Sequence, residues 1–173
     1  MTTAVRPPVP PLKPLSKGGI DAALERAQRY RLLHEPSQAE SICLDILDVD
    51  PENQEALVLL LLAITDAFSE NTEGARRALA LLPRLSGDYN RVYYEGLIHE
   101  RRARAIVARG GPGSGYGAYA ALTHAMKSFE RAEALRAPGH DDAILRYNAC
   151  VRLLASTPSI QEPPKADPSD LTE

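Results

Sequence analysis

The sequence predicts an all-α protein in which about seven helices pair as antiparallel neighbours and the pairs stack on one another. Apolar residues in the body recur three and four positions apart, the spacing of one face of a helix. Most helical segments are separated by two to five residues, and connections this short make consecutive helices antiparallel. Nine of the 14 prolines lie before residue 19 or after residue 156, so the body between them contains few helix-breaking residues.

We therefore divide the chain into a proline-rich leader at 1–18, a helical domain at 19–156 and an acidic, proline-rich tail at 157–173. The leader contains overlapping PxxP spacings, which favour extended polyproline II conformation. Both ends carry few residues that a core could bury, so we expect them to be disordered.

Two helices are predicted at the start of the helical domain, near Gly19–His34 and Ser37–Asp48. Ser37 followed by Glu40 has the spacing of a capping box, in which each side chain accepts a hydrogen bond from the other residue's backbone N–H. The capping box predicts that the second helix begins at Ser37. The apolar stripes of the two helices are Ile20, Ala23, Leu24, Ala27, Tyr30 and Leu33, then Ala39, Ile42, Cys43, Ile46 and Leu47.

A third helix is predicted near Pro51–Phe68 and a fourth near Thr72–Leu82. Asp50 can cap a helix N-terminus through its carboxylate. Pro51 suits the first helical position because the N–H that proline lacks would have no partner there. The pair Asp50-Pro51 therefore predicts that the third helix begins directly after Asp50.

The last three helices are predicted near Asp88–Arg109, Tyr116–Arg136 and Asp141–Ala155. The segment "GGPGSGYG" at 110–117 separates the first two of them. It lacks the Lys and Ser/Thr that end a phosphate-binding loop, and no strand precedes it, so we interpret it as a structural turn.

Two segments of the sequence, each a predicted helix followed by a turn, share a pattern of small and bulky residues with a proline near its end. They are "AESICLDILDVDPEN" at Ala39–Asn53 and "AMKSFERAEALRAPG" at Ala125–Gly139. The pattern resembles the tetratricopeptide repeat (TPR), a helix–turn–helix unit of 34 residues. The resemblance implies a short right-handed solenoid. Its implied repeats are about 20–53, 54–88 and 89–140, followed by a closing helix at 141–155.

The third repeat is longer than the resemblance requires. The family's interval across the internal turn is matched by the 12 residues from Ala27 to Ala39, whereas 29 residues separate Gly96 from Ala125. We therefore expect an elongated third hairpin, with an Arg-rich extension at 101–117. This extension is either a tolerated surface insertion or an arm that contacts an acidic partner. Its candidate partner-binding residues are Arg101, Arg102, Arg104, Arg109 and Tyr116.

The resemblance also implies a concave groove lined by the first helix of each repeat. Such a groove suits an extended or helical segment of a protein partner. The candidate groove residues are Leu24, Gln28, Arg31, Val58, Leu62, Thr65, Asn90, Tyr93, Leu97 and Glu100.

No catalytic constellation or cofactor motif is found in the sequence. Glu95 and His99 are four residues apart and could share a metal ion, but a site needs a third ligand and none is apparent. We therefore predict a helix-surface pair, no metal site and no cofactor. Cys43 and Cys150 lie on apolar faces, where a free cysteine acts as a small buried hydrophobe.

The charge and the apolar content of the sequence argue against two kinds of partner, nucleic acids and membranes. A net charge of −3 argues against nucleic-acid binding, which depends on a basic surface. The longest apolar run, Ala56–Ile64, is far shorter than the ~18–20 residues that cross a bilayer, and the first residues lack the apolar centre of a secretory signal. We expect a cytoplasmic protein that does not insert into membranes.

Charge is also distributed unevenly along the chain. Residues 20–55 carry nine acidic residues and three arginines, whereas residues 56–140 carry 11 basic and eight acidic residues. This asymmetry fits an ordinary solvated surface, and it also fits stacking into homo- or hetero-oligomers or a charged partner.

The leading hypothesis is a non-catalytic protein–protein interaction module that uses the groove, the Arg-rich hairpin or both. One alternative is a dedicated chaperone or assembly factor for a client protein. Another is an accessory subunit of an enzyme complex. An enzyme in its own right is the weakest hypothesis, because the sequence offers no residues for catalysis.

Overall fold

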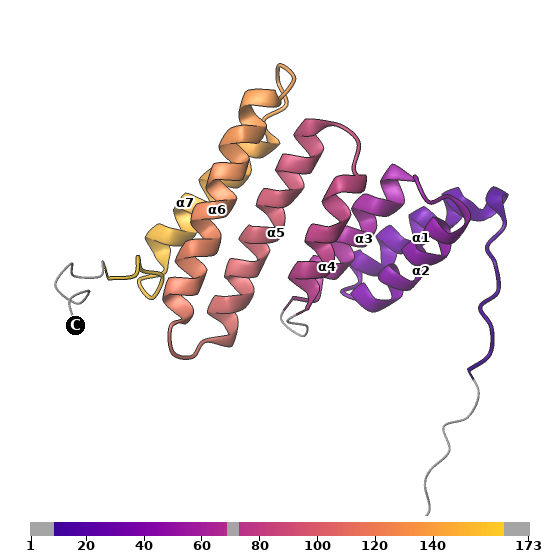
Figure 1. The fold of residues 1–173 in the computed structure, drawn as a ribbon, viewed down its shortest axis with the longest axis horizontal. Helices are drawn as coiled ribbons and strands as arrows, with labels where there is room; N and C mark the ends of the chain where they lie inside the picture. The colour runs from indigo at the N-terminus through magenta and orange to yellow at the C-terminus, as the bar shows by residue number, and fades with distance from the viewer. Residues whose placement is uncertain (1–8, 69–72, 165–173) are drawn as a thin grey trace, which may run out of the picture.

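The computed structural model describes residues 9–68 and 73–164, and within these ranges all regular secondary structure is helical. A short 3-10 helix at Lys17–Gly19 precedes the first α-helix, and a second at Leu82–Arg84 follows the fourth. Figure 1 shows the helices arranged as consecutive pairs along the long axis of the molecule. The α-helices are α1 (Ile20–Leu32), α2 (Pro36–Val49), α3 (Gln54–Asp66), α4 (Gly74–Leu81), α5 (Asp88–Arg109), α6 (Ser114–Leu135) and α7 (Asp142–Ser156).

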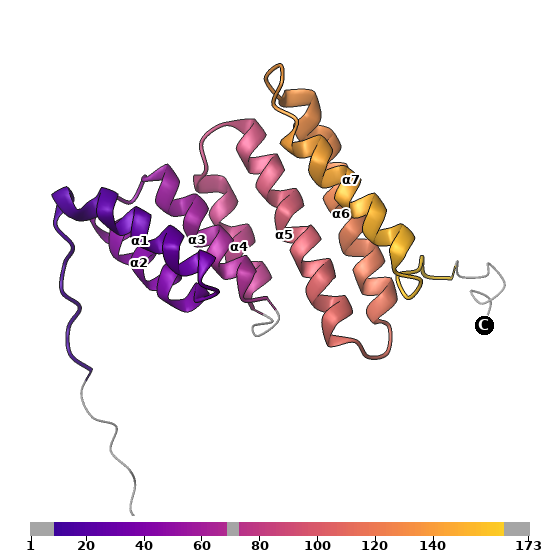
Figure 2. The ribbon, with the colours of Figure 1, turned by 180° about the vertical axis from the view of Figure 1, so that it is seen from behind.

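The helices form two layers. Each helix contacts the next in sequence, and α1, α3, α5 and α7 also contact one another in succession. In Figure 2, α7 lies in front of α6, whereas Figure 1 shows α6 in front. The predicted all-α fold of stacked antiparallel pairs is therefore confirmed. We call the surface formed by α1, α3, α5 and α7 the odd-helix face.

The starts of α2 and α3 differ from the predictions. Helix α2 begins at Pro36, one residue before Ser37, and no side chain caps it, so the predicted capping box is wrong. Proline takes the first helical position there because its fixed φ suits the helix and its missing N–H is no loss. Glu40 instead forms an ion pair with Arg77 of α4.

Helix α3 begins at Gln54, not at Pro51. The Asn53 side chain accepts a hydrogen bond from the backbone N–H of Ala56 (3.0 Å), and its amide donates to the Asp50 carboxylate (3.0 Å). Asparagine is as good a cap as aspartate. The predicted Asp50 cap is therefore wrong, and Pro51 lies in the turn between the pairs.

The core is built from small residues where helices cross and large residues between them. One cluster joins α1 to α4 and part of α5, with Ala27, Cys43 and Ile46 fully buried. A second cluster joins α5, α6 and α7 around Phe129. Gly96 allows α5 and α6 to cross closely, because a Cβ added there would lie 2.7–3.0 Å from the Phe129 ring. The helix faces predicted from apolar spacing are the faces that pack, except at Leu33, which follows the end of α1 and is 59% exposed.

The third hairpin is elongated, as predicted. Helix α5 begins and ends at the predicted residues, and both α5 and α6 have 22 residues. The loop between them turns on Gly110, Gly111 and Gly113, which have φ values of 65°, 99° and 73°. Positive φ is accessible to glycine at little cost, so these residues allow two long helices to be joined by a very short loop.

Two segments predicted to lie outside the folded body contact it. Leu15 packs against the first core cluster, and Ile160 is buried in the second. The C-terminal segment runs so close to α6 that a Cβ on Gly115 would lie 2.0 Å from the carbonyl oxygen of Ser159. These two residues of the leader and the tail therefore pack on the helical domain, and the disorder expected of the two segments stays a prediction. Residues 1–8 and 165–173, and the predicted helix start at Thr72, lie outside the described residues.

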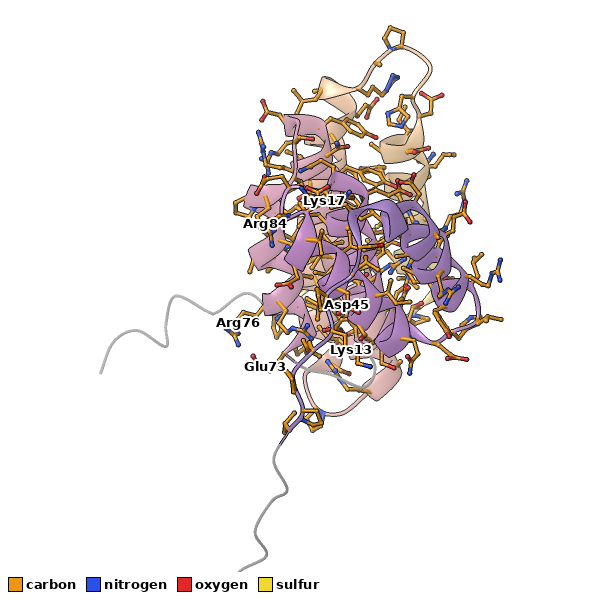
Figure 3. The ribbon with its side chains drawn as sticks, turned by 90° about the vertical axis from the view of Figure 1, so that its right-hand side faces the viewer. Lys13, Lys17, Asp45, Glu73, Arg76 and Arg84 are labelled. Atoms are coloured by element: carbon orange, nitrogen blue, oxygen red, sulfur yellow. The ribbon has the colours of Figure 1, made fainter. Side chains whose placement is uncertain are left out.

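The end of the stack formed by α1 and α2 is polar. Figure 3 views this end, where Lys13, Lys17 and Asp45 lie over the first helices. A hollow of about 280 Å³ between α1 and α2 is lined by Leu15, Ile42 and Asp45, among others. Among the described residues, no helix has the length and apolar content needed to cross a membrane.

Candidate functional site

A chain of ionic contacts crosses the odd-helix face from α1 to α5. Nε of Arg31 donates to the Asp66 carboxylate at 2.8 Å, and Arg101 donates to the other oxygen of the same carboxylate. Arg101 also donates to Oγ1 of Thr65 (2.6 Å) and to the carbonyl oxygen of Leu62 (3.2 Å). Burial lowers the pKa of the Arg101 guanidinium, and the Asp66 charge opposes that shift. Asp66 therefore holds two arginines from different helix pairs.

A second set of ionic contacts links α5 to α7 around a buried carboxylate. Glu100 is 1% exposed, and its Oε1 accepts hydrogen bonds from Nε (3.2 Å) and a terminal nitrogen (3.0 Å) of Arg104. A terminal nitrogen of Arg146 lies 3.5 Å from the other oxygen, Oε2, which has no hydrogen-bond partner. Two half-exposed arginines thus share one buried carboxylate, which leaves positive charge on the surface.

Two hollows lie side by side on the odd-helix face and share Asp66. One, of about 370 Å³, is lined by Arg31, Leu32, His34, Pro36 and Asp66. The other, of about 300 Å³, is lined by Thr65, Asp66, Phe68, Arg101, Arg104, Ala105 and Ala108. Their linings combine arginine heads with apolar side chains, which suits a peptide that carries both carboxylates and apolar groups.

The structure divides the ten predicted groove residues into buried and accessible sets. Leu24, Thr65, Leu97 and Glu100 are buried and offer almost no surface to a partner. The helices of this short stack pack closely, so the side chains at these four positions are covered by neighbouring helices. The accessible or half-buried residues are Gln28, Arg31, Val58, Leu62, Asn90 and Tyr93.

The predicted arm residues do not act as one free group. Arg101 and Arg104 are engaged on the odd-helix face, and Arg109 donates to the carbonyl oxygen of Phe68 (3.2 Å). Arg102 is exposed and lies about 160° around α5 from Arg104, since each helical residue turns by about 100°. Tyr116 is 43% exposed near the hairpin tip. The tip is therefore anchored through Arg109 to the turn that follows α3, and the C-terminal segment packs against the start of α6.

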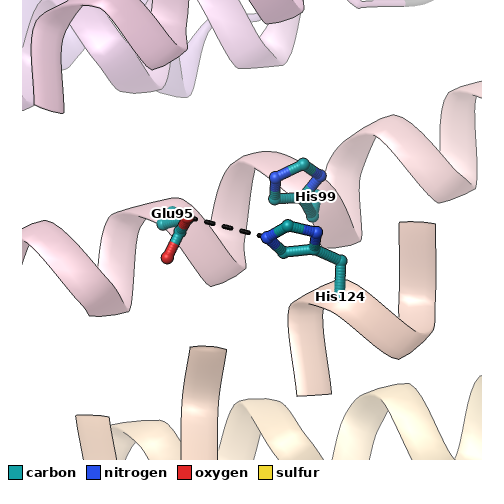
Figure 4. A group of neighbouring side chains, drawn as sticks. All are labelled: Glu95, His99 and His124. Atoms are coloured by element: carbon teal, nitrogen blue, oxygen red, sulfur yellow. Dashed lines mark ion pairs between the residues drawn. The ribbon is translucent and has the colours of Figure 1, made fainter. Parts of the chain in front are cut away.

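Three possible metal ligands converge where α5 crosses α6. Glu95, His99 and His124 each offer a ligand atom, and these atoms lie within 4.8 Å of one another. Figure 4 shows the His99 and His124 rings together, with the ion pair between Glu95 and His124 as a dashed line. Nε2 of His124 lies 3.6 Å from Oε1 of Glu95, and the two imidazole centroids are 3.9 Å apart.

The two cysteines are buried, as predicted. Burial raises the pKa of each thiol to about 12, so both thiols are neutral near pH 7. A thiol that stays protonated is a poor nucleophile. Neither cysteine is therefore a candidate for covalent chemistry.

Three residues of these sites were missed in the sequence: Asp66, Arg146 and His124. No local pattern marks Asp66 or Arg146, because their partners lie in other helices 35 or more residues away. A signal for His124 does exist. His99 lies 11 residues before Gly110 and His124 lies 11 residues after Gly113, and positions equidistant from a tight loop face each other in an antiparallel hairpin.

Neither a family model, nor a curated protein, nor a solved structure gives a significant match to this chain. We therefore infer what the odd-helix face can bind from the charges and hollows of that face.

Proposed function

We propose that this chain is a non-catalytic, TPR-like interaction module that binds an acidic segment of a protein partner along the odd-helix face. The helix pairing supports the TPR assignment, as does the crossing of Gly96 on Phe129, where the repeat pattern calls for a small residue against a large one. In this proposal the odd-helix face is the concave groove. The absence of a family match leaves the assignment resting on these residues.

The charge of the odd-helix face is the observation that carries the proposal. Its contacts bring together four arginines and two carboxylates, of which Glu100 is buried and the Asp66 side chain is 27% exposed. Arg104 and Arg146 keep 48% and 39% of their side-chain surface exposed. Arginine forks bind carboxylates bidentately, so an acidic peptide can add to this face without displacing the internal pairs.

A pair of bulky substitutions tests the proposed face. Ala108 is exposed and lines the hollow next to Arg101 and Arg104, and Ala120 is an equally exposed alanine on α6. Ala108→Trp fills the hollow, whereas Ala120→Trp adds the same side chain elsewhere on the same hairpin. Both variants and the wild-type chain are used to capture partners from the native host with crosslinking, and circular dichroism checks that each is folded.

We expect one partner to be captured by the wild-type chain and by Ala120→Trp but lost with Ala108→Trp. Peptides crosslinked to the partner should be acidic, and capture should weaken as salt is raised, because screening reduces attraction between exposed charges. Equal capture by all three chains would contradict binding at this face. Loss with Ala120→Trp alone would place the partner on α6 instead.

The same capture experiment distinguishes a chaperone or assembly factor from an accessory subunit of an enzyme complex. A chaperone or assembly factor should be found with an unassembled client and be absent from the finished complex. An accessory subunit should co-purify in a fixed ratio with the finished enzyme. We place the protein in the cytoplasm, which suits two unpaired cysteines, and we expect neither nucleic acid nor a membrane as its partner.

A further inference from the structure

A cluster of Glu95, His99 and His124 lies away from the proposed partner-binding face. Glu95 and His99 are one turn apart on α5, and the helical rotation of about 100° per residue puts them on the opposite side from Arg101 and Arg104. His124 reaches the cluster from α6 (Figure 4). A ligand held here would join the two long helices near their middle without touching the odd-helix face.

We propose that Glu95, His99 and His124 bind a divalent transition-metal ion, and that Zn²⁺ is the ion best matched to them. Two imidazoles and one carboxylate form a known three-residue zinc ligand set, in which water occupies the fourth position. Imidazole favours zinc and its neighbours in the series over Mg²⁺ or Ca²⁺, which prefer oxygen ligands only.

Glu95 is already oriented for this role. Its Oε2 accepts hydrogen bonds from Oγ of Ser128 (3.2 Å) and from Arg131 (3.1 Å). Oε1 is left facing Nε2 of His124 at 3.6 Å. Outer contacts of this kind fix the geometry of a metal ligand and usually matter for affinity.

His99 presents a neutral imidazole near pH 7. Burial lowers its pKa to about 4, with His124 and Arg102 acting in the same direction and Glu95 opposing them. Its ring nitrogen Nδ1 is buried and has no hydrogen-bond partner in the described structure. A buried ring nitrogen without a hydrogen-bond partner can act as a metal ligand.

Coordination of one ion by both histidines requires the side chain of His124 to move. Its side chain is half exposed, so it can rotate, whereas His99 is held between the helices. The rings now stack with an interplanar angle of 23°, so His124 has to rotate out of this stack before the lone pairs of both rings can point at one ion.

The test is Zn²⁺ binding to the full chain, produced with a tag that contains no histidine and stripped with a chelator. Calorimetric titration with Zn²⁺ should give one ion per chain, and the melting temperature should rise with Zn²⁺ concentration. Co²⁺ should give the visible absorption of a low-symmetry site with nitrogen and oxygen ligands. His124→Gln should weaken Zn²⁺ binding at least tenfold, roughly the loss expected even for a disturbed outer contact.

His140→Gln is the matched control, since His140 is also an exposed histidine but lies beside Asp142, outside the cluster. Zn²⁺ affinity should be unchanged in this variant. Glu95→Gln provides a second variant on the other helix and should also lose affinity. The proposal is overturned if the wild-type chain shows no Zn²⁺ binding up to about 100 μM. It is equally overturned if His124→Gln and Glu95→Gln bind as the wild type does, which would put the ion elsewhere.

Discussion

Nε of Arg31 lies 2.8 Å from the carboxylate of Asp66, although the two residues are 35 positions apart and belong to different helix pairs. The same carboxylate binds Arg101 of the third pair. Asp66 therefore connects the first, second and third helix pairs through one side chain. Its charge also offsets the repulsion between the two arginines, which are close enough for Arg31 to lower the pKa of Arg101.

Asp66→Asn should lower the free energy of unfolding by about 1–3 kcal/mol, the range for losing hydrogen bonds to a charged group. The amide keeps the shape of the side chain but leaves both arginines without a counter-ion. Urea denaturation measures the change. Asp88→Asn is the control, because Asp88 is 76% exposed and pairs with Arg91 one turn away, so its loss should cost less than about 1 kcal/mol. Equal losses in the two variants would contradict a special role for Asp66.

Gly96→Ala should destabilise the protein although alanine favours helices. The new Cβ would lie 2.7–3.0 Å from the Phe129 ring, which is fully buried and cannot move aside. Overpacking of this kind costs about 1–3 kcal/mol, against a helix-propensity gain of about 1 kcal/mol. Gly117→Ala is the matched control, since its nearest neighbour would be 3.8 Å away. That variant should gain about 0.5–1 kcal/mol, and thermal unfolding of both variants decides the sign.

Gly115→Ala should release the C-terminal segment from α6. A Cβ at this position would lie 2.0 Å from the carbonyl oxygen of Ser159, a backbone atom that can yield only if the segment shifts. Ile160 would then leave the second core cluster. Hydrogen exchange and limited proteolysis at 157–164 should accelerate, while Gly117→Ala on the same helix should leave both unchanged. Protection of the segment in Gly115→Ala would contradict the close approach.

The buried thiols predict a loss of stability in alkali. Burial raises the pKa of Cys43 and Cys150 from 9.0 to about 12, so above pH 9 the unfolded chain releases thiol protons that the folded chain retains. The unfolded state then binds fewer protons, and the free energy of unfolding falls between pH 9 and about 12. Cys150→Ala should show a shallower fall over this range than the wild-type chain. Rapid reaction of the folded protein with a thiol reagent at pH 8 would contradict the burial.

The sequence predicts helices better than it predicts their contacts. Helix α5 is bounded by Gly87 and Gly110, so its ends are marked locally and match the prediction. The start of α3 is not so marked, because Asp50 and Asn53 are both good caps and only the turn between the pairs selects Asn53. Leu24 and Leu97 have groove positions by resemblance, but packing between the helices buries them.

For the site residues too, the sequence predicts the residue type better than the contacts that it makes. Arg101 and Arg104 are visible in the sequence as an arginine cluster, yet whether they face a partner or a neighbouring carboxylate depends on Asp66 and Glu100. Such contacts depend on how the helix pairs stack, which no local spacing encodes. The pairing of His99 with His124 is the exception, because a four-residue loop between equal helices determines which positions meet.

The equal helices and short loop of the α5–α6 hairpin also bear on how the chain folds. The contacts nearest its four-residue loop are close in sequence, and local contacts form faster than distant ones such as Arg31 with Asp66. We therefore expect the loop end of the hairpin to form early in refolding, so that substitutions at Ala118 slow folding more than substitutions at Asp66 do. During synthesis, however, α1 to α4 emerge from the ribosome before the hairpin exists. The side of α3 that contacts α5 would then remain exposed until α5 arrives, which makes the nascent chain more prone to aggregation than the finished protein.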